Sequence, residues 1–361
     1  MGCSRPRRSR AFTSVLAAIL SLGRAVGVLG SDGVAHANRN DLLLSNLCDT
    51  SGGSGCPWVT RTPTATTVKL DAGAATRFRS LMSELGVVVA PRLQTPADTI
   101  GFAGFQFSAE LGTTEISRNQ SFWNGVEGVQ PSNPGAARPP SSLTTLGGFV
   151  RKGMFSPVPS IEFGAGAVNI LQSGMWSLSG YVKVALHEGF HSYPLPSVAV
   201  RFGLSELVGT DQVTLKVGSL DILISKAFSL AGTTRIEPFA GANLLFIDAQ
   251  SGVIDGTPEC DANTLKNTSA SDGAAVARLP KACQPQAGTT ADFGGNFQFA
   301  RQSVIHRHRW YGGAKLKLWK LFMVGQVAIS PAGSSVDTNS GGARDGSGAQ
   351  REVALSAGMD F

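Results

Sequence analysis

The sequence predicts an all-β protein, a transmembrane antiparallel up-and-down β-barrel of about 12 strands with a short N-terminal helical or irregular segment. Most of the chain after residue 85 consists of segments in which apolar and polar residues alternate, the period of a strand with two different faces. Short and long connections follow one another between these segments. The last segment alternates up to an aromatic residue at the carboxyl terminus. After the first 37 residues, no stretch is long and apolar enough for a transmembrane helix, which needs about 20 residues.

Residues 1–37 are predicted to be a cleaved secretory signal peptide. Arginines precede an apolar stretch over 11–22, and Ala35-His36-Ala37 forms a small-residue cleavage site. Five arginines and one aspartate lie in this segment, so its removal lowers the net charge from +6 to about +2. The high isoelectric point therefore belongs mostly to the signal peptide, and we expect no nucleic-acid partner.

Residues 38–85 are predicted to form an amino-terminal segment, and residues 86–361 are predicted to form the barrel. A helix is predicted from Asp71 to a stop at Gly86, because apolar residues recur at i, i+3, i+4 and i+7. These residues are Phe78, Leu81, Met82 and Leu85. A single apolar stripe fits two placements. The first, which we favour, is a short helix on the end of the barrel, and the second is a plug inside the lumen.

Eleven segments alternate strongly enough to predict strands. Their ranges are 86–93, 100–116, 145–155, 160–171, 174–188, 197–208, 211–229, 234–249, 302–318, 320–330 and 350–361. Within 211–229 the apolar phase changes near Gly218, which predicts a bulge. Because barrels of this kind normally have an even number of strands, we expect a twelfth in 58–70 or in 286–300.

The connections test the barrel independently of the strand assignments. If the last strand runs inward, the three longest connections, 117–144, 250–300 and 331–348, all fall at the outer end. They are rich in Gly, Ser, Pro, Asn and Thr, which is typical of solvated loops. A secreted β-sandwich, the alternative fold, does not account for this segregation.

Four cysteines follow the signal peptide, in two local pairs. An even count in an exported chain predicts the disulfides Cys48–Cys56 and Cys260–Cys283, since the nearest pairing closes the smallest loops. A metal site is the alternative, but no CxxC spacing supports it.

The string His187-Glu188-Gly-Phe-His191 matches H-E-x-x-H and resembles the zincin metallopeptidases over these residues alone. On a helix, His187 and His191 would bind zinc and Glu188 would activate water. The preceding residues alternate as a strand, however, and Pro194 and Pro196 prevent a helix from continuing. We therefore expect a strand end and a turn here, and no metal.

Charged residues recur on the polar faces of the predicted strands. The predicted lumen-facing set is Glu110, Glu162, Lys183, Arg201, Glu237, Arg307, Arg309, Lys315 and Lys317. A basic pore wall would favour anions, and near the outer end it would pair with lipopolysaccharide phosphates. The alternative, which we favour, is a solvated wall whose charges balance.

The final segment places five residues on one face, namely Val353, Leu355, Ala357, Met359 and Phe361. It resembles the C-terminal strand of bacterial outer-membrane β-barrel proteins, whose terminal aromatic helps the assembly machinery recognise the chain. With the signal peptide and the alternating body, the likeness is to the porin-like class of these barrels. It implies an outer-membrane location and contact with membrane lipid, lipopolysaccharide and the assembly machinery.

This resemblance implies a passive channel or transporter for a small solute, although a fold alone does not fix a function. A non-conducting surface or structural barrel with partner-binding outer loops is the first alternative. A zinc metallopeptidase built on His187, Glu188 and His191 is the second. We expect no enzymatic activity and no cofactor.

Overall fold

The computed structural model describes fourteen stretches of the chain. They are 39–47, 58–62, 65–69, 72–92, 94–129, 138–155, 160–188, 195–231, 234–254, 262–279, 283–284, 287–288, 297–339 and 342–361. All of them belong to the second of the chain's two units, Asn38–Phe361. The predicted signal peptide, residues 1–37, lies outside the described residues.

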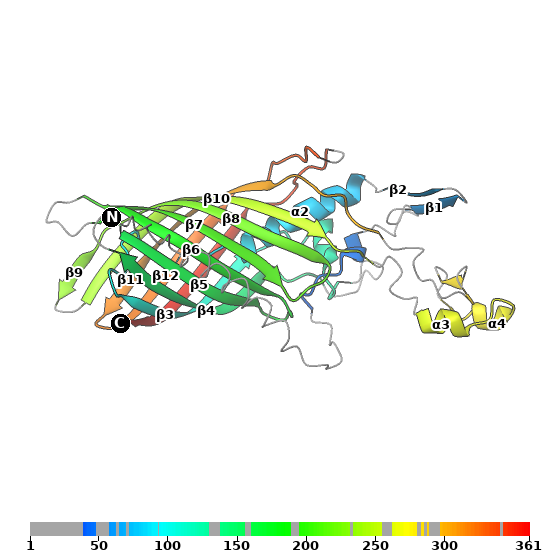
Figure 1. Cartoon of the computed structure of the whole chain (residues 1–361), viewed down its shortest axis with the longest axis horizontal. Helices are drawn as coiled ribbons and strands as arrows, with labels where there is room; N and C mark the ends of the chain where they lie inside the picture. The colour runs from blue at the N-terminus through cyan, green and yellow to red at the C-terminus, as the bar shows by residue number, and fades with distance from the viewer. Residues whose placement is uncertain are drawn as a thin grey trace, which may run out of the picture. The chain divides into compact units, whose positions relative to one another are not determined.

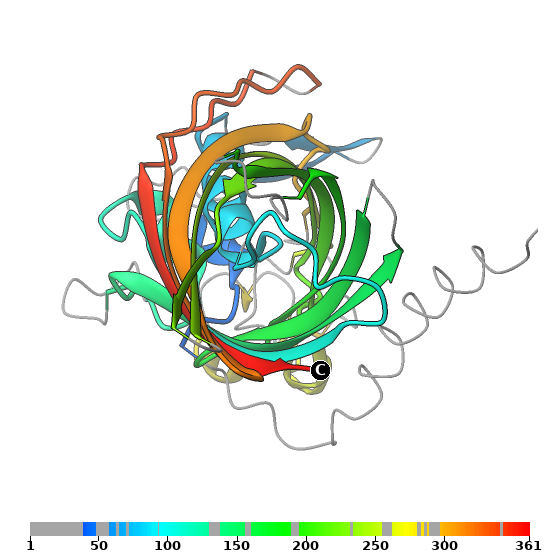
Figure 2. The same ribbon diagram turned by 90° about the vertical axis from the view of Figure 1, so that its left-hand side faces the viewer.

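Ten antiparallel strands close into a barrel (Figures 1 and 2). Each strand pairs with the next along the chain, and the pairs β10–β11 and β13–β3 complete the ring. The ten are β3 (Phe105–Glu115), β4 (Ser142–Phe155), β5 (Ser160–Ile170), β6 (Trp176–His187), β7 (Ser197–Val208), β8 (Val213–Ser225), β10 (Thr234–Ser251), β11 (Ile305–Leu318), β12 (Leu321–Ser330) and β13 (Gln350–Asp360). The short β9 (Phe228–Ala231) pairs with the start of β10.

The predicted count of about 12 strands is wrong for three reasons. The Val-rich 86–93 region is largely helical, because the helix α2 covers Ala72–Val89. The 58–70 region holds a separate hairpin of β1 (Trp58–Thr62) and β2 (Ala65–Lys69). Of 286–300, the described residues contribute only the isolated bridge Phe297–Ile254. The count is nevertheless even, as expected for this class of barrel.

Helix α2 lies inside the barrel, where Figure 2 shows its ribbon within the ring of strands. The favoured placement on the barrel end is therefore wrong, and the plug is the arrangement found. Its apolar stripe packs on inward-facing side chains of β8 and β10, in one buried cluster with Leu215, Leu245 and Ile247. The helix continues through Gly86 to Val89, so this glycine is not the predicted stop. A glycine is needed at this position because any side chain would collide with Ile247. A Cβ at Gly86 would lie only 2.6 Å from the Cδ1 atom of Ile247.

Strand β8 keeps its pairing with both neighbours without interruption, so the bulge predicted at Gly218 is absent from this strand. Its odd-numbered residues from Val213 to Ser225 all face inward. The apolar phase changes because the lumen changes along its length. The inward residues Val213 and Leu215 pack in the α2 cluster, whereas farther along Asp221 faces a polar interior.

The outer wall of the barrel is apolar. Large exposed side chains point away from the lumen on successive strands, among them Leu111, Leu204, Ile222, Met323 and Leu355. A barrel with an apolar exterior and a satisfied backbone is suited to a lipid bilayer. No helix in the described part of the chain is both long enough and apolar enough to cross a membrane.

The long connections gather at one end of the barrel, the outer end by the general rule for such proteins. They join β3 to β4, β10 to β11 and β12 to β13. The first contains η2 (Ser121–Gly125) and the second contains α3 (Ala262–Asn267) and α4 (Gly273–Val276). Phe361 lies at the inner end, where its amide donates to the carbonyl of Phe105 at 2.8 Å.

Candidate functional site in the lumen

From the start of α2 to the start of β3, the chain runs through the whole length of the lumen. We call the described residues 72–92 and 94–101 the inner segment. Helix α2 fills the outer part of the lumen, and an extended stretch continues to the inner end. Barrel side chains bind the backbone of this stretch at successive depths. Ser177 donates to the carbonyl of Val89 at 2.8 Å, and Arg309 donates to that of Pro91 at 3.1 Å. Nearest the inner end, the carboxylate of Glu162 accepts from the amide of Ile100 at 3.1 Å.

At the outer end, Arg307 joins the helix to the β12–β13 connection. Its guanidinium donates to the Ser83 hydroxyl at 2.9 Å and to the carbonyl of Pro331 at 2.6 Å. Ser83 in turn donates to Asp345 at 2.7 Å. A loop residue, a wall residue and a helix residue therefore share one network.

Glu84 performs the same role toward two outer connections. Its carboxylate accepts from the Trp123 indole at 2.7 Å, from the Ser117 amide at 2.9 Å and from the Gly348 amide at 2.8 Å. Glu84 itself is fully buried. Since a buried carboxylate is costly unless hydrogen-bonded, these donors fix the connections over the helix.

Ion pairs hold the middle of the inner segment. Arg92 pairs with Glu352 of β13 at 2.9 Å, and Arg309 pairs with the same carboxylate at 3.3 Å. Arg201 pairs with Asp221 at 3.0 Å and also donates to the hydroxyl of Thr95 at 2.9 Å. In the middle of the lumen, three guanidinium groups thus share two carboxylates, those of Glu352 and Asp221.

The wall is thinned where the extended stretch passes. A Cβ at Gly203 of β7 would lie 2.9 Å from the Cβ of Pro91, and a Cβ at Gly112 of β3 would lie 2.9 Å from a guanidinium nitrogen of Arg92. Larger residues at these two positions would push the inner segment away from the wall.

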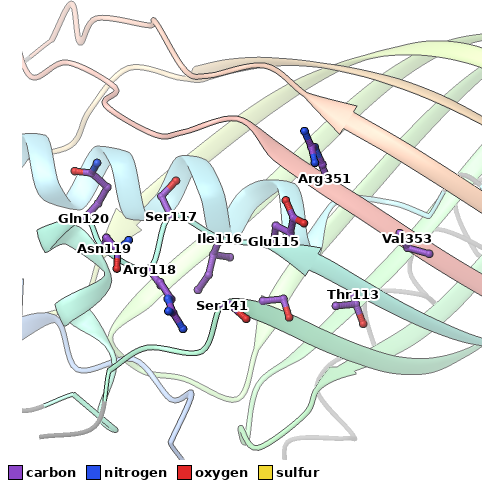
Figure 3. Close-up of a pocket in the computed structure, with 11 residues that line it drawn as sticks. Thr113, Glu115, Ile116, Ser117, Arg118, Asn119, Gln120, Ser141, Arg351 and Val353 are labelled. Carbon is purple, nitrogen blue, oxygen red and sulfur yellow. The ribbon is translucent and has the colours of Figure 1, made fainter.

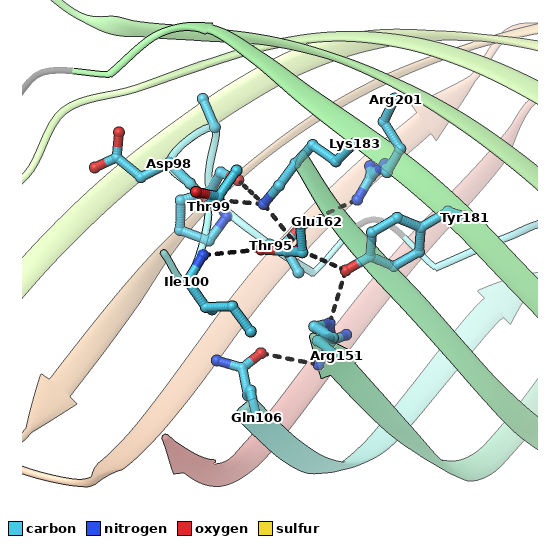
Figure 4. Close-up of polar contacts among 12 residues, drawn as sticks. Thr95, Asp98, Thr99, Ile100, Gln106, Arg151, Glu162, Tyr181, Lys183 and Arg201 are labelled. Atoms are coloured by element: carbon cyan, nitrogen blue, oxygen red, sulfur yellow. Dashed lines mark hydrogen bonds and ion pairs between the residues drawn. The ribbon is translucent and has the colours of Figure 1, made fainter. Parts of the chain in front are cut away.

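Lower in the lumen, a network links Glu110, Arg151, Tyr181, Glu162 and Lys183, most of which Figure 4 shows. The Tyr181 hydroxyl donates to Glu162 at 2.7 Å and accepts from Arg151 at 3.1 Å. Lys183 pairs with Glu162 at 3.1 Å, and each side chain is only 1% exposed. Lys183 also donates to the carbonyls of Pro96 at 3.0 Å and Asp98 at 2.9 Å. Arg151 and Glu110 form a further ion pair.

The inner mouth is partly open, with a cavity of about 350 Å³. Lys315 and Lys317 both bind Asp360, at 3.3 and 2.8 Å, and Arg235 binds Asp98 at 2.8 Å. The remaining predicted lumen residue, Glu237, accepts from Ser225 at 3.1 Å. All nine residues of the predicted lumen-facing set thus have partners inside the barrel.

The described part of the H-E-x-x-H string, His187 and Glu188, is not helical. His187 is the last residue of strand β6, and its Nδ1 lies 3.2 Å from the Pro196 carbonyl. Both oxygens of Glu188 accept hydrogen bonds, one of them from Thr99 of the inner segment at 2.6 Å. His191 lies outside the described residues. Within the described stretches, no group of His, Cys, Asp and Glu could hold a metal ion.

Cys283 is disulfide-bonded. Cys48, Cys56 and Cys260 lie outside the described residues, so the two pairings stay a prediction.

In β13, the residues Val353, Leu355, Ala357 and Met359 face outward, and the ring of Phe361 lies 6.3 Å from that of Phe105.

Several residues of the polar networks in the lumen were not singled out from the sequence. They are Arg79, Ser83, Glu84, Arg92, Arg151, Asp221 and Glu352. Three of these carried a usable signal, since Arg151, Asp221 and Glu352 occupy inward positions of alternating strands. The helix residues gave none, because a polar residue on an amphipathic helix normally faces water.

A second hollow lies on the outside of the barrel, near the outer ends of β3 and β13 (Figure 3). Its volume is about 600 Å³. Its charged lining residues are Arg118, Arg351 and Glu115. Ser141 and Ser142 add hydroxyl groups, and Ile116 and Val353 form its apolar side. Neither arginine has an ion pair within the described stretches.

The sequence matches no protein-family model and no curated protein sequence. Among solved structures, the chain is similar to OmpT, an outer membrane protein of Vibrio cholerae, with 10% identity, a TM-score of 0.25 and coverage of 62% of each chain. It is also similar to Ail of Yersinia pestis, with 7% identity, a TM-score of 0.24 and coverage of 72% and 99% of the two chains. It is similar as well to the translocator domain of the autotransporter NalP from Neisseria meningitidis, with 9% identity, a TM-score of 0.31 and coverage of 80% and 96% of the two chains. Likenesses this distant carry no functional argument.

The barrel's own architecture is that of bacterial outer-membrane proteins. It is closed, antiparallel and even-stranded, with an apolar exterior, a polar interior and its long connections at one end. The surrounding medium of the outer wall is therefore membrane lipid.

Proposed function

We propose that the protein is a plugged outer-membrane barrel that does not conduct in this state and acts at its outer face. The observation that carries this proposal is the inner segment, which runs from one mouth to the other and is bound by the wall along its course. The surface through which the protein acts would then consist of the long outer connections and residues 39–47.

The burial of the lumen charges supports an occluded interior. Arg201 and Arg309 are each 1% exposed, as is Lys183, although all three point into what would be the pore. A water-filled pore would leave such side chains hydrated. Ten strands also place this barrel nearer to the eight-stranded barrels filled by side chains than to the 16-stranded porins.

Planar-bilayer conductance of the refolded full chain tests this proposal. We expect no steady channels from protein whose heat-modifiable migration proves that the barrel has formed. Stable, long-lived channels from the unmodified chain would overturn it.

A passive channel is the second candidate, favoured by the cavity at the inner mouth. The contacts between the extended stretch and the wall are largely polar, so water could replace them if this stretch withdrew. Lys315, Lys317 and Lys183 would then line the path and favour anions. Anion-selective conductance that appears only in variants with a loosened inner segment would support a gated form of this channel.

The outer hollow supports lipopolysaccharide as a partner. Guanidinium groups bind phosphate in bidentate fashion, and Arg118 and Arg351 lie at the outer ends of β3 and β13, next to the apolar outer wall. We expect lipopolysaccharide to raise the unfolding temperature of the purified barrel, and the double variant Arg118→Gln, Arg351→Gln to lose most of that increase. The exposed Arg344, outside the hollow, provides the matched control Arg344→Gln. An equal loss in both variants would mean that the charge effect is unspecific.

A further inference from the structure

We infer that the amino-terminal part of the mature chain lies on the outer surface and has reached it through the lumen of its own barrel. This inference goes beyond the proposed function, because it concerns the route of the chain rather than conduction. It rests on where residues 39–47 are bound and on the direction of the inner segment.

Residues 39–47 bind three separate connections at the outer mouth. Leu42 forms a β-bridge with Val126, between β3 and β4. The carboxylate of Asp41 accepts from the Ser173 hydroxyl and the Gly174 amide, both at 2.8 Å, between β5 and β6. The amide of Leu44, in η1 (Leu44–Leu47), donates to Gln212, between β7 and β8. Contacts with three connections at one rim place this stretch at the outer mouth.

The chain returns to the same mouth before it enters the barrel. Near the start of α2, Arg77 donates to the carbonyl of Leu47 at 2.6 Å. Two residues on, Arg79 donates to the Ser303 carbonyl and the Ser335 hydroxyl, both at 2.9 Å, in two outer connections. Both ends of the chain between Leu47 and α2 are therefore outside.

From α2 the inner segment runs only inward. Its contacts pass from Arg307 near the outer end of β11 to Glu162 near the inner end of β5, and β3 then begins beside Phe361. Residues 39–47 and the start of α2 thus lie across the membrane from the start of β3. An outer-membrane chain arrives from the inner side, so these residues must have crossed.

The lumen is the only route along which the backbone finds partners. An unpaired peptide group in hydrocarbon costs several kcal/mol, which rules out passage of an extended chain through lipid. Along the lumen, Ser177, Arg309 and Lys183 bind backbone carbonyls of the inner segment itself. The thinned wall at Gly203 admits a chain beside it. The inner segment, which remains in the lumen, directly follows the part of the chain that passed through it.

Surface display of an epitope tag placed directly before Arg39 tests the final location. We expect antibody to bind intact cells, as it should for an outer control tag between Ser269 and Ala270. A tag between Trp319 and Lys320, at the inner turn, should be detected only after permeabilisation. Detection of the Arg39 tag only after permeabilisation, or of the inner-turn tag on intact cells, would overturn the inference.

The route is tested by a small disulfide-stabilised domain inserted before Arg39. A domain that folds before barrel closure cannot pass the lumen, so its surface display should fall at least tenfold. Its Cys→Ser form, unfolded and of equal length, should be displayed like the tag alone. Equal display of the folded and unfolded forms would show that the segment does not pass through the lumen. Neither readout depends on conductance. Failure of this inference can therefore be distinguished from failure of the plugged-barrel proposal.

Discussion

The guanidinium of Arg92, in the inner segment, pairs with the carboxylate of Glu352 in the last barrel strand at 2.9 Å. Both side chains are almost completely buried, and Arg309 approaches the same carboxylate at 3.3 Å. One wall carboxylate therefore pairs with both a cation of the plug and a cation of the wall. A buried pair of this kind is costly to break, because removal of one partner leaves an uncompensated charge.

Replacement of Glu352 by Gln should destabilise the barrel by about 3–5 kcal/mol, since two buried guanidinium groups lose their shared anion. Urea unfolding of the refolded protein, followed by heat-modifiable migration, measures the change. The control is Glu206→Gln, which removes an exposed pair with Lys216 at 3.5 Å. An exposed pair contributes about 0–1 kcal/mol, so equal losses in the two variants would contradict the assigned role of Glu352.

Gly86→Leu should displace α2 from β10. Relief of the glycine's helix penalty returns about 1 kcal/mol, but overpacking against Ile247 costs about 1–3 kcal/mol. We expect a net loss of stability and faster proteolysis of the inner segment in the assembled barrel. The double variant Gly86→Leu, Ile247→Ala should recover part of the loss because it makes room for the new side chain. Gly273→Ala, in open space, is the neutral control. A Gly86→Leu protein as stable as the wild type would refute this close approach.

Alternation in the sequence was enough to predict the barrel because ten strands are buried on one side only. It failed at Val87, Val88 and Val89, where β-branched residues read as a strand. There the helix gains more from burying these residues in the lumen than it loses in propensity. The change of apolar phase at Gly218 also led to the wrong prediction of a bulge. The lumen that β8 faces is apolar beside α2 and polar closer to the inner end.

Glu127 should make the docking of residues 39–47 depend on pH. Burial, followed by the nearby Asp41 carboxylate, raises the pKa of Glu127 above its ordinary value. A group whose pKa is raised on folding binds more protons in the folded state, so docking should weaken as the pH rises above about 4.3. Amide exchange of residues 39–47, corrected for the intrinsic rate, should show less protection at pH 7 than at pH 4. In Glu127→Gln this difference should shrink, and an unchanged difference would mean that another group titrates.

The charged residues of the lumen were predictable one by one, but their purpose was not. Lys183 and Arg201 lie on the polar face of strands, which a solvated pore wall would also require. Their actual partners include Pro96, Asp98 and Thr95, in a stretch with no periodicity. A sequence does not reveal that such a stretch runs inside the barrel, because the contact depends on closure of all ten strands.

Hydrogen exchange of residues 81–100 in the protein assembled in outer-membrane vesicles tests the occupied lumen most directly. If the inner segment fills the barrel as described, its amides should exchange as slowly as those of the neighbouring strands β7 and β8. Exchange of these amides within seconds, in a barrel whose strands stay protected, would show that the segment lies outside the lumen and would contradict the account.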